Sequence, residues 1–166
     1  MPRAPAQNGV VPTEAPRPAP LPPRLFIRAA WAVHRAIYRM SEGRRGLRPA
    51  TPQQWGTMRL HTRGRRTGAE RVAILGYFED GANLVTTAMN GWSSPEPAWW
   101  LNLQANPEAT VDLINGPRRV RGRMAGPEER SRLWARWAEY EKNLDRFAAR
   151  RSGETAVVIL EPAPQP

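Results

Sequence analysis

Paired turn residues divide the chain from residue 57 onward into short segments with strand character, and this division constrains the fold more than any other feature. Asp80-Gly81 and Asn115-Gly116 each stand between two apolar runs, a pattern typical of tight β-hairpins, and Gly64 ends another run. The segments predicted as strands are 57–63, 71–79, 83–89, 109–114, 118–125 and 155–161. Six short strands joined mainly by hairpins predict a small antiparallel barrel.

Two helices are predicted to interrupt these strands. The first covers 97–105 and has Pro97 in its first turn, and the second runs from Pro127 to about residue 150 with Glu128 and Glu129 at its start. Proline and acidic residues are favoured at a helix N-terminus, because the first N–H groups have no helical partner and the helix dipole is positive there. Helices laid over an antiparallel barrel place the chain in the α+β class.

The N-terminal region has a different composition. Residues 1–23 contain 8 of the 18 prolines and few large apolar side chains, which predicts a disordered tail. Residues 24–42 have apolar side chains at helical spacing and arginines off that line, so they predict an amphipathic helix. This helix either covers one side of the barrel or contacts a membrane surface. We expect one domain over 24–161 and a disordered C-terminal tail over 162–166.

Composition excludes several classes of chemistry. The 166 residues include no cysteine and only two histidines, which excludes disulfides, thiolate nucleophiles and iron–sulfur clusters and argues against any metal site. No apolar run approaches the ~20 residues that span a bilayer, and no secretory signal is visible, so we expect a cytoplasmic protein. The net charge is +10, and residues 1–71 carry 14 arginines against 3 glutamates. An anionic partner is therefore expected: a nucleic acid, a membrane face or a cofactor.

The hairpin loop between the first two predicted strands is the best candidate for binding an anion. Residues 62–71 read Thr-Arg-Gly-Arg-Arg-Thr-Gly-Ala-Glu-Arg. The two glycines allow a tight backbone turn, Arg65, Arg66 and Arg71 can pair with phosphate oxygens, and Thr67 can donate a further hydrogen bond. The same residues would also suit a basic hairpin that only contacts solvent. The sequence contains neither a Walker loop nor a GxGxxG motif.

Two further segments could border a ligand. After the third predicted strand, Ala88-Met89-Asn90-Gly91 opens into a small polar loop, which can offer backbone N–H groups to a planar ring, although an ordinary loop would look the same. In the helix over 97–105, Trp99 and Leu103 lie four residues apart and are expected to seal the core. Trp100 and Asn102 are expected to point elsewhere, where they could meet a ligand.

The sequence shows no protein-based catalytic group. We find no Ser-His-Asp arrangement, no Gly-x-Ser-x-Gly elbow, no paired carboxylates in a polar loop and no metal-ligand spacing. A chain of this kind either binds without reacting or takes its chemistry from a cofactor.

In order and spacing, several motifs resemble the deazaflavin-dependent nitroreductase family. They are Gly64-Arg65-Arg66-Thr67-Gly68, Arg71, Pro97-Ala98-Trp99-Trp100-Leu101-Asn102-Leu103 and Asn106-Pro107. The resemblance covers roughly residues 55–161. It implies a split β-barrel of the FMN-binding type and use of coenzyme F420, a deazaflavin with a phosphate and an oligoglutamate tail, in preference to FMN.

The resemblance also implies roles for individual residues. Arg65, Arg66, Thr67, Gly68 and Arg71 would hold the phosphate and tail of the cofactor. Ala88, Met89, Asn90 and Gly91 would lie beside the deazaflavin ring, and Trp100 and Asn102 would border the same pocket. Tyr140 and Trp100 are candidates for the substrate pocket. The implied reaction is hydride transfer to a quinone, a nitroaromatic or a similar electron-poor acceptor.

Two positions depart from the family pattern. Gly76 stands where members often have tyrosine, and Met89 where they often have serine. The physiological acceptor is therefore left open.

Three hypotheses follow from the sequence. The chain is an F420H2-dependent oxidoreductase, a non-catalytic protein that sequesters F420 or a flavin, or a nucleic-acid binder. The last rests on the charge and the interleaved Trp and Arg residues, and the missing recognition motif argues against it. We expect a small-molecule acceptor, no nucleic-acid partner, and either a monomer or a homodimer.

Overall fold

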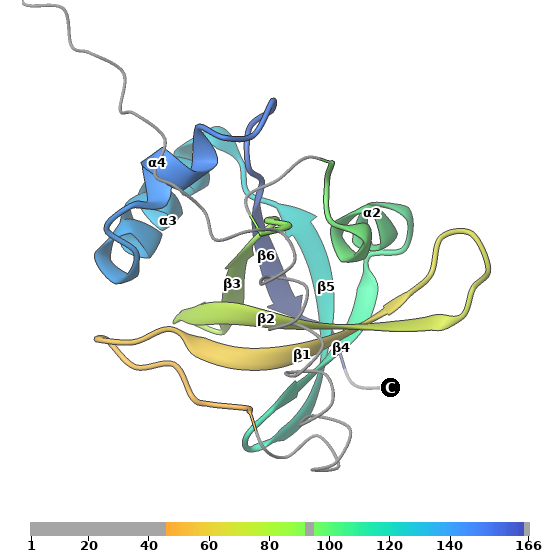
Figure 1. Cartoon of the computed structure of the whole chain (residues 1–166). Helices are drawn as coiled ribbons and strands as arrows, with labels where there is room; N and C mark the ends of the chain where they lie inside the picture. Colours follow the sequence, from red (N-terminus) through yellow and green to blue (C-terminus); the bar gives the residue numbers. More distant parts are fainter. Residues whose placement is uncertain (1–45, 92–94, 165–166) are drawn as a thin grey trace, which may run out of the picture.

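The computed structural model describes residues 46–91 and 95–164. The predicted tail 1–23 and the predicted helix 24–42 lie outside the described residues. Within the described part, helices are few and strands dominate (Figure 1).

Six antiparallel strands form a closed barrel in the order β1-β2-β3-β6-β5-β4, and β4 pairs with β1 to close it. The strands are β1 (Gly56–Arg63), β2 (Glu70–Asp80), β3 (Asn83–Thr87), β4 (Glu108–Leu113), β5 (Gly116–Met124) and β6 (Val157–Pro162). All six predicted strands are present with ends shifted by at most two residues, so the predicted barrel is confirmed.

Local sequence explains the hairpins. Gly81 and Gly116 have φ values of +61° and +120°, which side chains with a Cβ rarely adopt. Along β1, residues with buried side chains alternate with more exposed ones, so Met58, Leu60 and Thr62 point into the barrel. The turn residues and the alternation together determine which face of each strand is inside.

Three helices accompany the barrel: α2 (Ala98–Ala105), α3 (Pro127–Tyr140) and α4 (Leu144–Ala148). In Figure 1, α2 lies near the long β1–β2 hairpin, whereas α3 and α4 lie together at the opposite side of the barrel. The helix expected over 97–105 is therefore confirmed, except that it begins at Ala98 and Pro97 is its N-cap residue.

The prediction of one continuous helix from Pro127 to residue 150 was wrong. Glu141 has extended backbone angles, its N–H donates to the Trp137 carbonyl, and α3 ends there. The Glu141 carboxylate then accepts a hydrogen bond from the Asn143 N–H at 2.9 Å. This local side-chain bond competes with the helical pattern and starts a new turn at Leu144.

Backbone hydrogen bonds explain two of the shifted strand ends. β3 ends at Thr87 instead of Met89, because the Met89 N–H turns back to the Thr87 carbonyl at 2.9 Å and leaves the ladder. β6 continues to Pro162, and the Ala163 N–H still donates to the Arg119 carbonyl at 3.0 Å. The sheet therefore reaches past residue 161, where we expected the domain to end.

Buried side chains form two clusters, one on each side of the sheet. The first fills the barrel and includes Met58, Leu60, Trp100, Leu103 and Val158. The second lies between the sheet and α3–α4, and its members are Phe78, Val85, Ala125, Leu133, Trp137, Leu144, Val157 and Ile159. The strands β2, β3 and β6 therefore carry apolar residues on both faces.

Candidate functional site

The tip of the β1–β2 hairpin is a compact turn. The Gly64 N–H donates to the Ala69 carbonyl and the Gly68 N–H to the Gly64 carbonyl, each at 2.8 Å. Gly68 has φ +70°, and a Cβ on Gly64 would lie 2.9 Å from the Ala69 oxygen, so both glycines are required by the geometry. The Thr67 hydroxyl accepts a hydrogen bond from the Ala69 N–H at 3.4 Å. The turn is therefore fixed by its own backbone.

Asn102 of α2 fastens this turn to the barrel. Its Oδ1 accepts hydrogen bonds from the Arg65 backbone N–H at 3.2 Å and from Arg65 Nη1 at 3.3 Å. Its Nδ2 donates to Thr62 Oγ1 at 3.3 Å, and Thr62 Oγ1 donates to the Arg71 carbonyl at 3.3 Å. Asn102 and Thr62 are both buried. The structure thus brings together Arg65, Asn102 and the start of β2.

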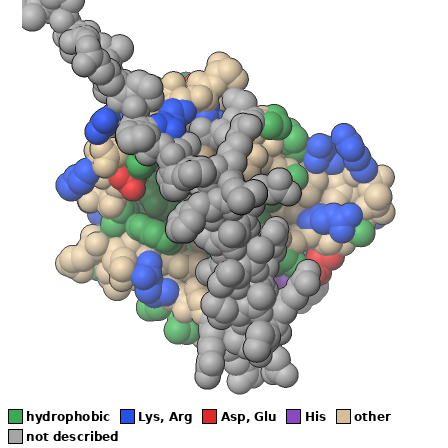
Figure 2. Space-filling model, in the orientation of Figure 1, with side chains coloured by type: hydrophobic (Ala, Val, Ile, Leu, Met, Phe, Trp, Pro, Cys, Tyr) green, Lys and Arg blue, Asp and Glu red, His purple; other side chains and the backbone are tan. Residues whose placement is uncertain are grey.

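The arginine side chains of the turn remain exposed. Arg66 has no ion pair or hydrogen bond with any described residue, and Arg71 only donates to the neighbouring Glu70 carbonyl at 3.4 Å. Figure 2 shows Lys and Arg side chains standing out at this end of the molecule. Guanidinium groups held on a rigid turn without carboxylate partners suit a phosphate or a carboxylate ligand.

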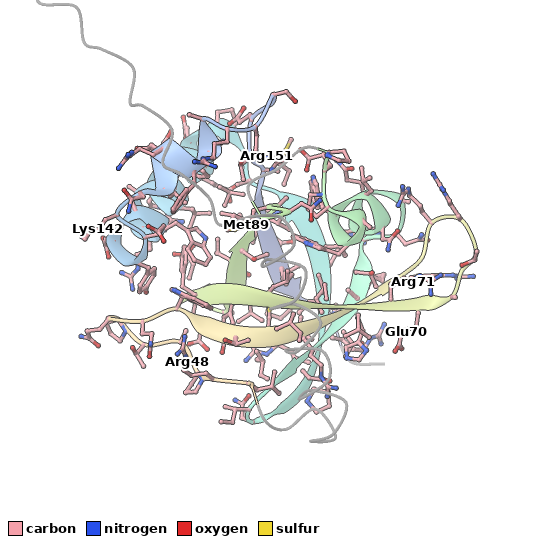
Figure 3. All side chains as sticks on the ribbon, in the orientation of Figure 1. Arg48, Glu70, Arg71, Met89, Lys142 and Arg151 are labelled. Carbon is pink, nitrogen blue, oxygen red and sulfur yellow. The ribbon has the colours of Figure 1, made fainter. Side chains whose placement is uncertain are left out.

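The loop that follows β3 is the second half of the predicted site. Ala88 is fully buried, Met89 is partly exposed, and Asn90 and Gly91 are exposed. Gly91 has φ +56°, so the chain turns sharply there. In the view of Figure 3, Met89 and Arg71 lie on opposite sides of α2. The predicted site is therefore extended, with its cationic part at the hairpin.

Arg151 holds this loop, and the sequence prediction missed it. Its Nη1 donates to the Ala88 carbonyl and, at 3.3 Å, to Thr155 Oγ1, while its Nη2 donates to Glu96 Oε1 at 2.7 Å. The Ala88 N–H also donates to the Ala156 carbonyl at 2.8 Å. Both polar backbone groups of Ala88 are thus bound by the connection between α4 and β6.

One buried hydroxyl at the same place has no partner. Thr87, the last residue of β3, is 1% exposed, and its Oγ1 makes no hydrogen bond in the described structure. Buried hydroxyls are normally paired with a protein group, a water or a ligand. An unpaired hydroxyl next to Ala88, together with free guanidinium groups on the hairpin, fits a ligand with a polar ring and an anionic tail.

The structure corrects the expectation for α2. Trp100 was expected to point away from the core, but it is 4% exposed and belongs to the barrel cluster, as does Trp99. Asn102 is also buried and its amide is used by the hairpin. The reason is that α2 contacts β1, β2 and β5, so more than one of its faces is covered.

Tyr140 lies at the end of α3 and already uses its hydroxyl. The Tyr140 Oη donates to the Thr51 carbonyl at 3.2 Å and accepts a hydrogen bond from Arg136 Nη2 at 3.3 Å. Its ring lies 6.1 Å from the rings of Phe78 and Trp137. Tyr140 therefore joins α3 to the segment before β1, and a role in a substrate pocket stays a prediction.

Gly76 is covered by an aromatic side chain from elsewhere in the chain. A Cβ on Gly76 would lie 2.9 Å from the Trp55 ring and 3.4 Å from the Trp137 ring. The Arg48 guanidinium lies 5.2 Å from the centre of the Trp55 ring, and Arg48 Nη2 donates to the Trp55 carbonyl at 3.0 Å. Trp55 thus occupies the space that a side chain at position 76 would need.

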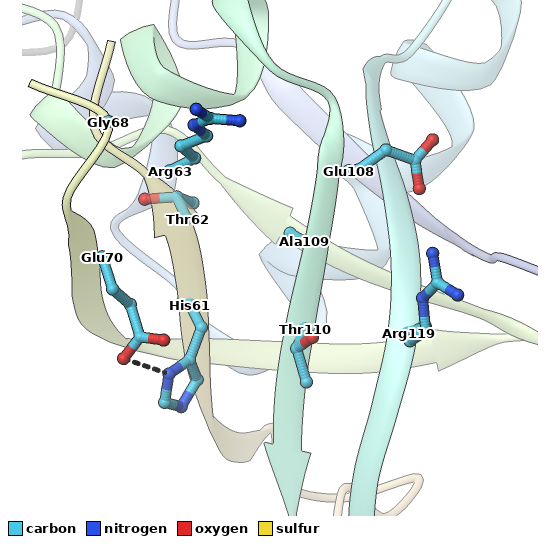
Figure 4. Close-up of a pocket in the computed structure, with 9 residues that line it drawn as sticks. All are labelled: His61, Thr62, Arg63, Gly68, Glu70, Glu108, Ala109, Thr110 and Arg119. Atoms are coloured by element: carbon cyan, nitrogen blue, oxygen red, sulfur yellow. Dashed lines mark hydrogen bonds and ion pairs between the residues drawn. The ribbon is translucent and has the colours of Figure 1, made fainter. Parts of the chain in front are cut away.

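An open pocket of about 310 Å³ lies on the outer face of the barrel (Figure 4). It is lined by His61, Thr62, Arg63, Gly68, Glu70, Glu108, Ala109, Thr110 and Arg119. Of the predicted cofactor residues, it includes only Gly68. His61 lies between Glu70, at 3.2 Å from Nδ1, and Asp112, at 3.0 Å from Nε2. This pocket therefore adjoins the hairpin part of the extended site, with which it shares Thr62 and Gly68.

Charge pairs far from this site stabilise α3. Arg123 donates from Nη1 and Nη2 to the two Glu129 oxygens, each at 2.8 Å, and from Nε to Glu161 at 2.6 Å. The hydrogen bonds from Arg123, and that from the Gly126 N–H, lower the pKa of Glu129 to about 2. A hydrogen bond from Arg132 likewise lowers the pKa of Asp80. These groups stay charged near neutral pH.

Two classes of feature are missing from the described residues. No set of three or more His, Cys, Asp or Glu side chains in 46–91 and 95–164 is arranged to bind a metal ion. In the same ranges, every helix is too short or too polar to cross a membrane.

Comparison with known proteins identifies the family. Residues 31–162 match the profile of the F420H2-dependent quinone reductases. A protein named F420H2-dependent quinone reductase from Mycobacterium tuberculosis (strain ATCC 25618 / H37Rv) is 34% identical over 136 residues, which cover 77% of this chain and 87% of that protein. The chain belongs to this family. The predicted class of enzyme, an F420H2-dependent oxidoreductase, and the predicted cofactor, F420, are confirmed.

Two solved structures support the fold. One, described as an F420-H2 dependent reductase, is 23% identical with a TM-score of 0.58 and aligns with 63% of this chain and 93% of that chain. Another, described as a domain-swapped dimer, is 21% identical with a TM-score of 0.60 and aligns with 81% of this chain and 99% of that one. The split-barrel fold expected from the sequence is thereby confirmed for this member of the F420H2-dependent quinone reductase family.

Proposed function

We propose that this protein binds reduced F420 in the extended site between the β1–β2 hairpin and the loop after β3, and that it reduces a quinone there. The observation that carries the proposal is the rigid hairpin turn, whose guanidinium groups have no carboxylate partner and whose position is held by Asn102. Family membership supports the same cofactor and acceptor.

The residues that would hold F420 fall into two groups. Arg65, Arg66 and Arg71, with Thr67 and Gly68, would bind the phosphate and the glutamate carboxylates through charge-assisted hydrogen bonds. Residues 88–91 would lie beside the deazaflavin ring, where the unpaired Thr87 hydroxyl offers one hydrogen bond. Arg65 already donates one guanidinium hydrogen bond to Asn102, so Arg66 and Arg71 have more donors available for F420.

When bound, reduced F420 supplies a hydride from C5 of its deazaflavin ring. The protein's contribution is then to hold the ring and the acceptor in one orientation, which can lower the barrier without any side chain joining the reaction. The buried position of Ala88 and the tight turn at Gly91 suit this task, since both restrict the loop that borders the ring. Met89 is the partly exposed side chain of that loop and would face the acceptor side.

The acceptor is a quinone in this proposal, and nitroaromatic compounds are a second class of electron-poor acceptor. Both accept a hydride on a flat conjugated ring, so a pocket built only from shape and apolar walls would admit either. Initial rates with a soluble quinone and with a nitroaromatic of matched size, measured at the same concentration of reduced F420, would show which class of acceptor the protein reduces faster. A rate with the quinone that does not exceed the nitroaromatic rate would contradict the assigned acceptor.

Cofactor binding is tested by titrating the purified full chain with F420 and, in parallel, with FMN, using the fluorescence of its seven tryptophans. We expect F420 to bind at micromolar concentration or tighter and FMN much more weakly, because FMN has no glutamate tail for the hairpin. Equal affinity for both would contradict the assignment of the hairpin. If neither binds, and salt-sensitive binding of DNA is observed instead, the protein is a nucleic-acid binder.

We also propose that the chain forms a homodimer. A structural neighbour described as a domain-swapped dimer supports this. Light scattering measures the mass of the protein in solution, and the mass of a monomer would exclude the dimer.

We further propose that the chain contacts the inner face of the membrane, where lipid-soluble quinones reside. The basic amphipathic pattern of residues 24–42 supports this contact. Flotation with anionic vesicles compares the wild type with a variant that has Arg28, Arg35 and Arg39 changed to Gln. Equal distribution of the two proteins would exclude membrane contact through these residues.

A further inference from the structure

Arg151 is the only charged residue that is buried in the described part of the chain. Its side chain is 3% exposed, and it follows α4 in the connection that leads to β6. A guanidinium group loses much of its hydration when it is buried, so a buried arginine persists only where partners replace the water. The partners of Arg151 therefore indicate what the residue is for.

These partners come from three separate segments. Arg151 binds Thr155 in its own connection, the Ala88 carbonyl in the loop after β3, and the Glu96 carboxylate just before α2. Ala88 and Glu96 stand on either side of the loop that follows β3, so one side chain fixes both of its ends. The partly exposed Glu96 supplies the balancing charge at 2.7 Å.

The network is not fully satisfied. Arg151 Nε and Glu96 Oε2 are both buried, and neither has a hydrogen-bond partner in the described structure. The network lies directly beside residues 88–91, because Arg151 binds the Ala88 carbonyl and the Glu96 carboxylate. It therefore connects the segment before β6 with the loop that borders the proposed cofactor site.

We propose that Arg151 is a positioning residue for F420. Arg151 donates to the Ala88 carbonyl and to the Glu96 carboxylate at the same time. It thereby fixes residues 88–91, so that the deazaflavin ring binds in a single orientation toward the acceptor. The inference rests on the proposed function and adds to it a residue outside the motifs of the hairpin and α2. It separates two tasks: the hairpin arginines determine affinity, and Arg151 determines the orientation of the ring.

The test compares Arg151→Gln with a matched control, Arg130→Gln. Arg130 Nη2 donates to the Thr155 carbonyl at 3.1 Å, so it supports the same connection, but within the described residues it makes no hydrogen bond or ion pair with Ala88 or Glu96. A role limited to stabilising this connection would affect both variants alike. For each full-length variant, the melting temperature, the Kd for F420, the visible absorption of bound F420 and the kcat and KM with a soluble quinone are measured.

We expect kcat of Arg151→Gln to fall by roughly 10- to 100-fold, since a misplaced ring loses alignment with the acceptor. Its Kd for F420 should stay within about twofold of the wild-type value, because the hairpin contacts are distant. The absorption change of F420 on binding should be reduced in Arg151→Gln and retained in Arg130→Gln. Wild-type kcat and absorption in Arg151→Gln, or equal losses in both variants, would overturn the inference.

If Arg151→Gln does not fold, Glu96→Gln decides the question. This variant keeps the size of the side chain and one hydrogen-bond acceptor but removes the charge that holds Nη2. We expect a several-fold lower kcat with unchanged F420 affinity, and a wild-type kcat and absorption would overturn the proposal. Absence of F420 binding in the wild type would instead overturn the proposed function, so the two failures are distinguishable.

Discussion

At the scale of single residues, the hairpin arginines and the glycines around them carry the clearest physical arguments. Arg66 and Arg71 are exposed on a turn whose backbone is fixed by Gly64 and Gly68. Both arginines and both glycines could be identified from the sequence, because a ligand-binding turn uses local residues at short spacing. Arg151 could not, since its partners Ala88 and Glu96 lie 63 and 55 positions away in the chain.

Replacing Arg66 and Arg71 by Gln should weaken F420 binding strongly. Each charge-assisted hydrogen bond to an anion contributes about 1.5–3 kcal/mol, which corresponds to a roughly 10- to 150-fold increase in Kd per residue. The tryptophan-fluorescence titration gives the Kd. Arg132→Gln is the control, because Arg132 is an exposed arginine of α3 that pairs with Asp80 at 2.7 Å, on the other side of the barrel from the hairpin (Figure 1). Equal Kd values for the double variant and the control would rule out the hairpin as the cofactor site.

Gly76→Ala should lower the free energy of unfolding by about 1–3 kcal/mol, because the added Cβ would collide with the Trp55 ring. Chemical denaturation measures the change. Gly153→Ala is the control, since nothing lies within 4 Å of a Cβ there. Combining Gly76→Ala with Trp55→Ala should recover part of the loss, and a strictly additive double variant would show that Trp55 does not restrict position 76.

At the scale of elements, α2 does more than cover the barrel, because it carries the residue that anchors the hairpin. Trp99 and Leu103 were correctly predicted as core residues from their spacing. The burial of Trp100 and Asn102 was not predicted, since helical periodicity describes one buried face and cannot show that a short helix packs against β1, β2 and β5 with more than one face. The break between α3 and α4 was missed for a similar reason, because it depends on the hydrogen bond between the Glu141 carboxylate and the Asn143 N–H.

Asn102→Ala should lower both stability and cofactor affinity. The substitution removes the hydrogen bonds from Asn102 to Thr62 Oγ1 and from the Arg65 N–H to Asn102, and a typical hydrogen bond contributes about 0.5–1.5 kcal/mol. The freed hairpin should then bind F420 more weakly. Thermal melting and the F420 titration measure the two effects, with Gln104→Ala on the exposed face of α2 as the control. A stable variant with unchanged affinity would show that α2 does not hold the turn in place.

The ion pair at the start of α3 predicts an acid-sensitive contribution to stability. The pKa of Glu129 falls from its usual 4.5 to about 2 in the folded protein, mainly through Arg123. A carboxyl whose folded pKa is lowered stabilises the fold fully above its unfolded pKa and loses that effect as the pH falls toward the folded value. The difference in unfolding free energy between wild type and Glu129→Gln should therefore be constant above pH 4.5 to 5 and shrink toward about pH 2. Urea titrations across this range measure it, and a pH-independent difference would contradict the pairing.

At the scale of the whole molecule, the barrel could be predicted because its turns are encoded locally. Asp80-Gly81 and Asn115-Gly116 mark two hairpins directly, and the alternation in β1 shows which side is inside. The assembly of the site could not be predicted in the same way, since the hairpin, α2 and the loop after β3 come together only once the sheet has closed. The residues that join them, Asn102, Thr62 and Arg151, are polar groups whose partners depend on that closure.

The most direct test of the central claim is single-turnover oxidation of reduced F420 by a soluble quinone, followed by the return of the deazaflavin absorption with and without the protein. We expect the protein to accelerate the oxidation in proportion to its concentration and the Arg66, Arg71 double variant to lose most of this effect at low cofactor concentration. Tight F420 binding with no acceleration would contradict the claim and would show that the protein sequesters the cofactor.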